Sequence, residues 1–243
     1  MQYEGIGENY HELTKYIRGS MPHGDAHRSL RPSLKKTFGK PPKLFLLPAP
    51  VTSGGPSLWD AMHARRSLRS YRRAPFSLND VSQLLWATQG TTQRVGDYKL
   101  RSSPSAGALY PVETYLLINR VTGLPAGIYH YDALEAVLQL LKEGALGPQA
   151  AVAALDQYMA DDAAIVFIWT AVVGRAKWKY SERAYRYIYM DAGHIAQNLY
   201  LAAAALGFGC CSIGAFYDEE INHLIEVDGK TETVVYMACV GKT

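Results

Sequence analysis

Two hydrophobic patterns recur along the chain: short apolar runs typical of strands, and longer stretches with apolar residues at helical spacing. Residues 163–173, AAIVFIWTAVV, form a continuous apolar run, which predicts a strand buried on both faces. Further strands are predicted by β-branched and aromatic content at 112–120, 127–132, 136–144 and 233–241. The chain therefore contains the strands of a substantial sheet.

The predicted helices are marked by capping residues and by apolar positions three or four apart. Ser57 with Asp60, and Ser77 with Asp80, form capping-box patterns. The longest helix is predicted over residues 182–206, a length on the order of 35–40 Å. Its wide apolar face predicts a central helix or a subunit interface. That face comprises Ala184, Ile188, Ala192, Ile195, Ala196, Leu199, Ala202, Ala203 and Leu206.

The order of these elements indicates the fold class and the domain organisation. Strands and helices are mixed without regular βαβ alternation, which predicts an α+β fold. Residues 9–17 predict a short helix, and residues 19–56 hold seven of the 12 prolines. We therefore predict an N-terminal helix and irregular proline-rich arm over 1–56, followed by one domain over 57–243.

Composition narrows the possible functions and the expected location. The 243 residues carry a net charge of only +3, which argues against a general nucleic-acid binder. The beginning of the chain lacks the pattern of a signal peptide. Glycines interrupt the apolar stretch 199–216, so it predicts a helix end, a turn and a strand instead of a membrane span. Three cysteines without metal spacing favour a cytoplasmic protein with reduced thiols.

Common nucleotide-binding, metalloprotease and serine-hydrolase motifs are absent, and three short segments remain as candidates for chemistry. The first is ARRSLRSYRRAP, residues 64–75, which we call the arginine segment. Guanidinium groups suit a phosphate, which accepts bidentate hydrogen bonds. From composition alone, a solvated and salt-bridged surface is the alternative interpretation.

The other two segments are rich in small residues. RSSPSAGALYPVE, residues 101–113, places small residues before a predicted strand, so its backbone could approach a flat ligand closely. We call this stretch the small-residue loop. GFGCCSIGAF, residues 207–216, could direct a glycine N–H toward a ligand atom. An ordinary turn is the alternative interpretation of each.

Taken in order, these segments resemble the FMN-dependent nitroreductase superfamily. RRSLRSY resembles its opening Arg-x-Ser-x-Arg/Lys motif, and PSAGALYPVE resembles the Pro-Ser loop of SagB-type dehydrogenases. RAYRYIYMDAGHIAQNLYLAAAALGFGCCSIGAF resembles the family's long interface helix and flavin loop. The resemblance extends from residue 57 to the end. It implies a homodimer with a mainly antiparallel central sheet, flanking helices and a long interface helix.

The resemblance also implies which residues bind the cofactor. The phosphate, ribityl chain and pyrimidine edge of FMN would contact Arg65, Arg66, Ser67 and Arg69. The isoalloxazine would be flanked, across the subunit interface, by Pro104, Ser105 and Ala106. Its other side would meet Ser212, Ile213, Gly214 and Ala215, with the Gly214 N–H near flavin N5. Lys242 is the basic residue available in the C-terminal tail, and Arg72 and Arg73 fall outside the motif.

Lys179 and Tyr180 match a Lys-Tyr pair tied to catalysis in azoline-oxidising SagB-type enzymes. Dehydrogenation beside a carbonyl requires a base, and an adjacent ammonium would lower the pKa of a tyrosine. The pair can serve one ligand only if it precedes the long helix. Two surface residues at a helix start are the alternative.

Asp191, His194 and Asn198 fall on one stripe of the long helix. We expect a satisfied polar network at this stripe, and no metal site.

The sequence thus predicts an FMN-dependent oxidoreductase that transfers hydride, with a small-molecule substrate and no nucleic-acid or membrane partner. A SagB-type dehydrogenase is the first interpretation. An NAD(P)H-dependent nitro or quinone reductase and a non-catalytic flavin-binding protein are the alternatives.

Overall fold

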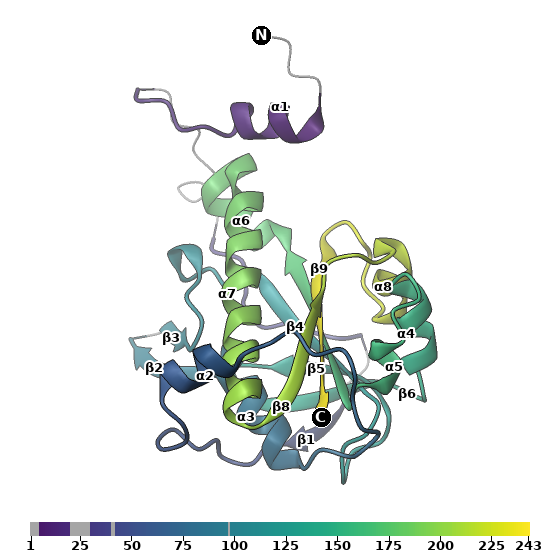
Figure 1. Ribbon diagram of the computed structural model, residues 1–243. Coiled ribbons are helices and arrows are strands. Elements are labelled where there is room, and N and C mark those ends of the chain that lie inside the picture. Colours follow the sequence, from purple (N-terminus) through teal and green to yellow (C-terminus); the bar gives the residue numbers. More distant parts are fainter. Residues whose placement is uncertain (1–4, 20–29, 40–41, 97) are drawn as a thin grey trace.

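The computed structural model describes residues 5–19, 30–39, 42–96 and 98–243 (Figure 1). Within these residues a seven-stranded sheet has the order β1-β6-β5-β4-β7-β9-β8, and each neighbouring pair is antiparallel. The fold is therefore α+β with an antiparallel central sheet, as predicted. The strands are β1 (Lys43–Leu46), β4 (Val112–Ile118), β5 (Gly127–Asp132), β6 (Val137–Glu143), β7 (Ile165–Val172), β8 (Phe208–Ile213) and β9 (Glu232–Lys242).

Helices cover both faces of this sheet (Figure 1). One face packs against α3 (Leu78–Gln89) and α7 (Ala184–Ala205), and the other against α4 (Gly147–Ala153), α5 (Met159–Asp162) and α8 (Asp218–Leu224). Side chains of β7 alternate between the two cores: Phe167 joins the first, and Val166 joins the second. The predicted burial of this strand on both faces is confirmed.

The predicted long helix is α7, preceded by α6 (Val173–Tyr180) and the short η3 (Ser181–Arg183). Most of its apolar face is buried within its own chain, against α3 and the sheet. Ala202 stays half-buried, and Leu206 lies just past the helix end with 38% of its surface exposed. Of the two predicted alternatives, a central helix is thus confirmed, and the width of the apolar face is no argument for a second copy of the chain.

The two predicted helix starts are both capped. Ser77 and Asp80 form a complete capping box at the start of α3. Ser57 accepts a hydrogen bond from the Asp60 N–H at the start of α2 (Leu58–Ala64). Helix α2 leads directly into the arginine segment.

Several elements were not predicted. The predicted arm contains β1, which pairs with β6 at one edge of the sheet. The four residues of β1 are mostly exposed, so they lack the alternation of buried apolar and exposed polar side chains by which a strand is predicted. The β2–β3 hairpin (Thr91–Val95 and Tyr98–Arg101) was also missed. The N-terminal helix α1 spans Ile6–Leu13, earlier than expected, and lies beyond the start of α7 (Figure 1).

Residues 1–4, 20–29 and 40–41 of the predicted arm lie outside the described residues. Among the helices that the structure describes, none has the length and apolarity needed to cross a membrane.

Candidate functional site

The arginine segment lies along β8, the strand at one edge of the seven-stranded sheet. Ser67 bridges to Cys210 of β8, and the Leu68 N–H donates to the Cys210 carbonyl at 3.0 Å. The Tyr71 hydroxyl donates to the Leu68 carbonyl at 2.7 Å. The absence of a side chain at Gly241 makes room for the Tyr71 ring, since a β-carbon there would lie 2.7 Å from it. The segment is therefore held in one position by β8, β9 and its own tyrosine.

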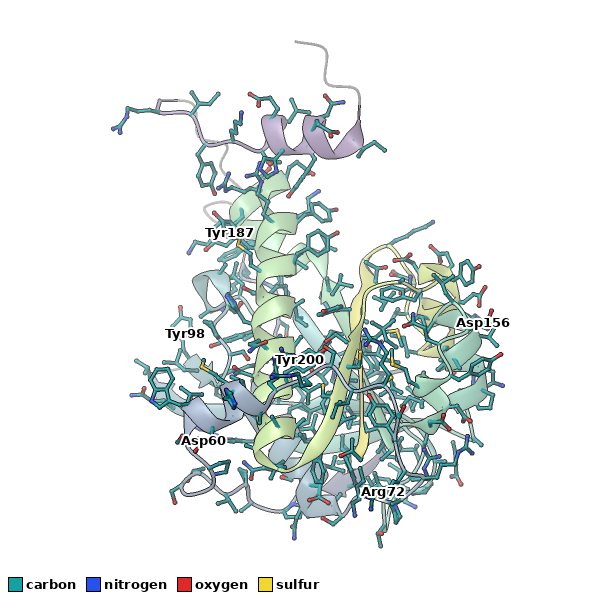
Figure 2. All side chains as sticks on the ribbon, in the orientation of Figure 1. Asp60, Arg72, Tyr98, Asp156, Tyr187 and Tyr200 are labelled. Atoms are coloured by element: carbon teal, nitrogen blue, oxygen red, sulfur yellow. The ribbon has the colours of Figure 1, made fainter. Side chains whose placement is uncertain are left out.

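Tyr200, which the sequence analysis did not single out, joins three parts of the candidate site. Its hydroxyl lies 3.1 Å from the Ser67 hydroxyl and accepts a hydrogen bond from the Ser212 N–H at 2.8 Å. The Arg65 guanidinium lies over its ring, 5.4 Å from the centroid. Figure 2 shows Tyr200 partway along α7, beside the body of the protein. The arginine segment, α7 and the end of β8 thus meet at one phenol.

The arginines of the segment differ in their surroundings. The guanidinium groups of Arg65 and Arg69 form no hydrogen bond or ion pair with the described part of the chain. Arg66 donates to the carbonyls of His63 and Arg65, at 2.9 and 2.8 Å. A cavity of about 190 Å³ opens beside Arg66 and Tyr200. The guanidinium groups of Arg65 and Arg69 therefore remain available to an anion.

Arg73 has a different environment, as expected for a residue outside the motif. Its guanidinium forms ion pairs with Asp161 at 2.5 Å and Asp162 at 2.9 Å. These bonds raise the pKa of Arg73. The main chain of Arg72 pairs with that of Lys242, with an N–H···O distance of 2.8 Å. Lys242 consequently lies at the end of β9, next to the arginine segment.

The four candidate residues at the end of β8 and just after it divide into buried and exposed positions. Ser212 is half-buried, whereas the Ile213 side chain belongs to the core, so only the main chain of Ile213 could meet a ligand. Gly214 and Ala215 are exposed. These two residues directly follow β8, and Ser212, whose N–H binds the Tyr200 hydroxyl, lies two positions before Gly214.

The small-residue loop is fastened to α7 by Asp191. The Asp191 carboxylate accepts from the Ser105 hydroxyl at 2.6 Å and from the Ala106 N–H at 3.2 Å. Burial raises the pKa of Asp191, and these two hydrogen bonds oppose that rise. Pro104 stays exposed beside them, at the edge of the loop.

The expected polar network on α7 is formed by two of its three predicted members. Asn198 donates to the Ala87 carbonyl and the Ser103 hydroxyl, each at 3.0 Å. Together with Asp191, it secures the small-residue loop at Ser103, Ser105 and Ala106. His194 is exposed and lies outside this network. Among the described residues, no group of His, Cys, Asp and Glu side chains is placed to bind a metal ion.

Lys179 and Tyr180 end helix α6, just before η3 and α7. Both side chains reach Gly107 of the small-residue loop. A β-carbon on Gly107 would lie 2.6 Å from the Tyr180 hydroxyl oxygen and 3.1 Å from Lys179 Nζ. The pair therefore meets the condition that it precede the long helix, and its two polar atoms converge on one point of the loop.

The expected effect on the Tyr180 pKa is wrong in sign. Burial raises the pKa of Tyr180, and Tyr187 and Asp191 raise it further. The Tyr187 ring lies 4.6 Å away, centroid to centroid. A sequence-adjacent ammonium does not outweigh this environment, so Tyr180 is a protonated hydrogen-bond donor at neutral pH.

The candidate site is divided between two sides of α7. Asp191 and Tyr200 are nine residues apart, which separates them by about 13–14 Å along the helix and about 180° around it. One side holds the small-residue loop with Lys179 and Tyr180. The other side holds the arginine segment and the end of β8.

Comparison with known proteins gives this architecture a family. Residues 62–242 match the nitroreductase family. The protein MJ1384 of Methanocaldococcus jannaschii, which bears a provisional nitroreductase name, is 39% identical over 171 residues, covering 70% of this chain and 84% of its own. The trifolitoxin-processing protein TfxB of Rhizobium leguminosarum bv. trifolii is 36% identical over 145 residues, 54% of this chain and 38% of TfxB.

Two solved structures share the fold. A crystal structure from Anabaena variabilis, also provisionally named a nitroreductase, has 28% identity and a TM-score of 0.76, covering 97% of this chain and 46% of that one. The E. coli microcin synthetase McbBCD complex with truncated pro-MccB17 bound has 19% identity and a TM-score of 0.63, covering 98% of this chain and 92% of the matched one. The chain thus spans less than half of TfxB and of the Anabaena protein. The long match and the shared architecture together establish that this chain belongs to the nitroreductase family.

Proposed function

We propose that the protein is an FMN-dependent dehydrogenase of the SagB type that acts as a homodimer. The observation that carries this proposal is the convergence of Lys179 Nζ and the Tyr180 hydroxyl on Gly107. A cation and a phenol that converge on one exposed point of the small-residue loop can bind a reacting group of a substrate. Flavin binding alone does not require such a pair.

The arginine segment fits the phosphate end of FMN. Arg65 and Arg69 lack anionic partners among the described residues, and a phosphate would supply two negative charges. Arg66 and Tyr200 line the neighbouring cavity, the Ser67 hydroxyl lies against that of Tyr200, and Lys242 pairs with Arg72 of the same segment. The cavity of about 190 Å³ is smaller than the roughly 300–1,000 Å³ of ordinary ligand pockets, so it suits a phosphate but not a whole FMN.

A second copy of the chain would complete the site. The phosphate side and the small-residue loop lie on opposite sides of α7, so one flavin is not within reach of both in a single chain. Between them, α7 exposes Met190, Gly193, His194 and Gln197 at helical spacing. We propose that this stripe lies at the dimer interface. Pro104, Ser105 and Ala106 would then flank the flavin bound by the neighbouring chain, and Ser212, Ile213, Gly214 and Ala215 would approach it through main-chain atoms.

Bound FMN would supply the hydride-accepting chemistry. The chain's own residues would position the substrate. The protonated Tyr180 hydroxyl and the Lys179 ammonium are two donors aimed at one place, which suits a carbonyl oxygen of the substrate. Donors at that oxygen would stabilise the negative charge that builds up there when the proton of the adjacent carbon passes to solvent water, which can reach the exposed Gly107.

The names of two relatives favour a substrate that belongs to the processing of a peptide product. TfxB is named for trifolitoxin processing, and the McbBCD complex contains pro-MccB17.

Anaerobic stopped-flow mixing of the FMN-loaded protein with NADH and with NADPH tests the direction of electron flow. The dehydrogenase account predicts no rapid bleaching of the flavin by either nucleotide. Rapid bleaching would instead support an NAD(P)H-dependent nitro or quinone reductase. Protein that binds FMN, yet exchanges electrons with no nucleotide or azoline substrate, would support a flavin-binding protein without turnover.

A further inference from the structure

The small-residue loop has an unusual backbone conformation. Gly107, Ala108 and Tyr110 all have positive φ, at 63°, 50° and 43°. Glycine adopts this left-handed region freely, but a β-carbon makes it unfavourable for Ala108 and Tyr110. Two strained residues so close together, separated only by Leu109, persist only where the surrounding structure holds them.

An arginine binds the carbonyl group of each of these two residues. The Arg31 guanidinium donates to the Ala108 carbonyl. Arg175 Nη1 donates to the Tyr110 carbonyl at 3.2 Å. Each strained peptide therefore has a charged donor that fixes its direction.

Both contacts involve the N-terminal segment, whose role the sequence left open. Besides binding Tyr110, Arg175 donates to the carbonyls of Ser33 at 3.0 Å and Leu34 at 3.2 Å. It is 4% exposed and also pairs with Glu113 at 2.5 Å. One buried guanidinium thus joins the N-terminal segment to the end of the small-residue loop.

Arg31 itself is seated from the other side. Its guanidinium lies over the Tyr98 ring of the β2–β3 hairpin, 5.1 Å from the centroid. Figure 2 shows Tyr98 at the hairpin, on the side of α7 away from the C-terminal strands. Further along the segment, Lys36 forms an ion pair with Glu232 of β9. Residues 31–36 therefore run along the body of the protein instead of extending from it.

We propose that residues 31–34 hold the small-residue loop in its left-handed conformation, with Arg31 and Arg175 as positioning residues for the FMN ring. The part of this inference that concerns FMN rests on the proposed function. The part that concerns the loop conformation does not.

The test uses Arg31→Ala in the full-length chain, because Arg31 is half-buried, whereas Arg175 is a buried counter-charge of Glu113. We expect FMN affinity to fall about tenfold, the scale of one lost charged hydrogen bond. The melting temperature of the FMN-free protein should stay near that of the wild type. Lys35→Ala, at an exposed position of the same segment, is the control and should change neither quantity.

Ala108→Gly provides the decisive second variant, because glycine removes the cost of positive φ. In the Arg31→Ala background it should restore most of the lost FMN affinity. Alone it should alter affinity by no more than about twofold, since the native conformation is retained. Hydrogen exchange of the amides of residues 106–110, measured without FMN, should become faster in Arg31→Ala than in Lys35→Ala.

The outcomes separate the inference from the proposed function. Wild-type affinity and unchanged amide exchange in Arg31→Ala would overturn the positioning role. Weakened binding that Ala108→Gly fails to restore would overturn the explanation through backbone strain. If the wild-type protein binds no FMN, the proposed function fails, and the exchange comparison alone then decides whether Arg31 holds the loop.

Discussion

Replacing Tyr200 with phenylalanine removes one oxygen atom at the point where three segments of the candidate site meet. The ring stays, so its packing and its contact with Arg65 are preserved. The Ser212 N–H loses its acceptor at 2.8 Å, and the Ser67 hydroxyl loses its neighbour at 3.1 Å. The substitution therefore isolates the hydrogen bonds from the hydrophobic contribution of the side chain.

The magnitude follows from the burial of these groups. An unsatisfied buried donor costs about 1–3 kcal/mol, and Ser212 is only half-buried, so the lower half of that range applies. We expect the free energy of unfolding to fall by about 1–1.5 kcal/mol, which corresponds to roughly 2–6 °C in melting temperature for a chain of this length. Because Ser67 is no longer fixed, FMN affinity should fall roughly five- to tenfold, or about 1–1.4 kcal/mol.

Urea unfolding of the FMN-free protein and fluorescence titration with FMN measure the two effects. Tyr158→Phe is the matched control, because the Tyr158 side chain is 70% exposed. A Ser67→Ala variant tests the connection further, since its effect on affinity should add less than fully to that of Tyr200→Phe. If Tyr200→Phe behaves like Tyr158→Phe in both measurements, Tyr200 does not organise this site.

Three more predictions follow from the site and its surroundings. Arg65→Ala should weaken FMN binding by about 1.5–3 kcal/mol in the same titration. Arg73→Ala should leave FMN binding unchanged, because Arg73 is paired with aspartates outside the site. Equal effects of the two variants would contradict the assignment of Arg65, but not Arg73, to the phosphate site. Burial raises the pKa of Glu113, but the hydrogen bond and charge of His130 outweigh it, together with nearby arginines, and hold the pKa at about 2 against an ordinary 4.5. The ionised Glu113 carboxylate therefore stabilises the fold above pH 4.5, and on the order of 3 kcal/mol of unfolding free energy is lost as the pH falls toward about 2. Glu113→Gln should flatten the dependence of the urea midpoint on pH between these values. An unchanged pH dependence would contradict the role of Glu113. Tyr180→Phe should keep the FMN content and melting temperature of the wild type but slow substrate-driven flavin reduction by about 10²–10³-fold, the range for a lost donor at a developing oxyanion. Flavin reduction at the wild-type rate would show that Tyr180 takes no part in the reaction.

Much of the architecture was accessible from sequence because its signals are local. The run 163–173 is apolar except for Thr170, and burial on both faces of β7 follows directly from that. Ser77 and Asp80 are three residues apart, so their capping box can be recognised without tertiary information. The three candidate segments were likewise visible as unusual local compositions.

The features that were missed depend on contacts between distant residues. Tyr200 is one of 17 tyrosines, and its partner Ser67 is 133 positions away. The role of residues 31–34 depends on Arg175, more than 140 positions later. For Tyr180, sequence adjacency suggested that Lys179 would lower the pKa, whereas burial against the protein body raises it.

The proposal that two chains share each FMN is tested most directly by sedimentation velocity followed at the visible absorbance of the flavin. In the proposed dimer, one chain binds the FMN phosphate at its arginine segment, and the small-residue loop of the second chain flanks the flavin ring. The flavin absorbance should therefore sediment with the dimer, at about one FMN per chain. Removal of FMN should shift the protein toward the monomer by mass action. Flavin that sediments with a stable monomer would contradict the account.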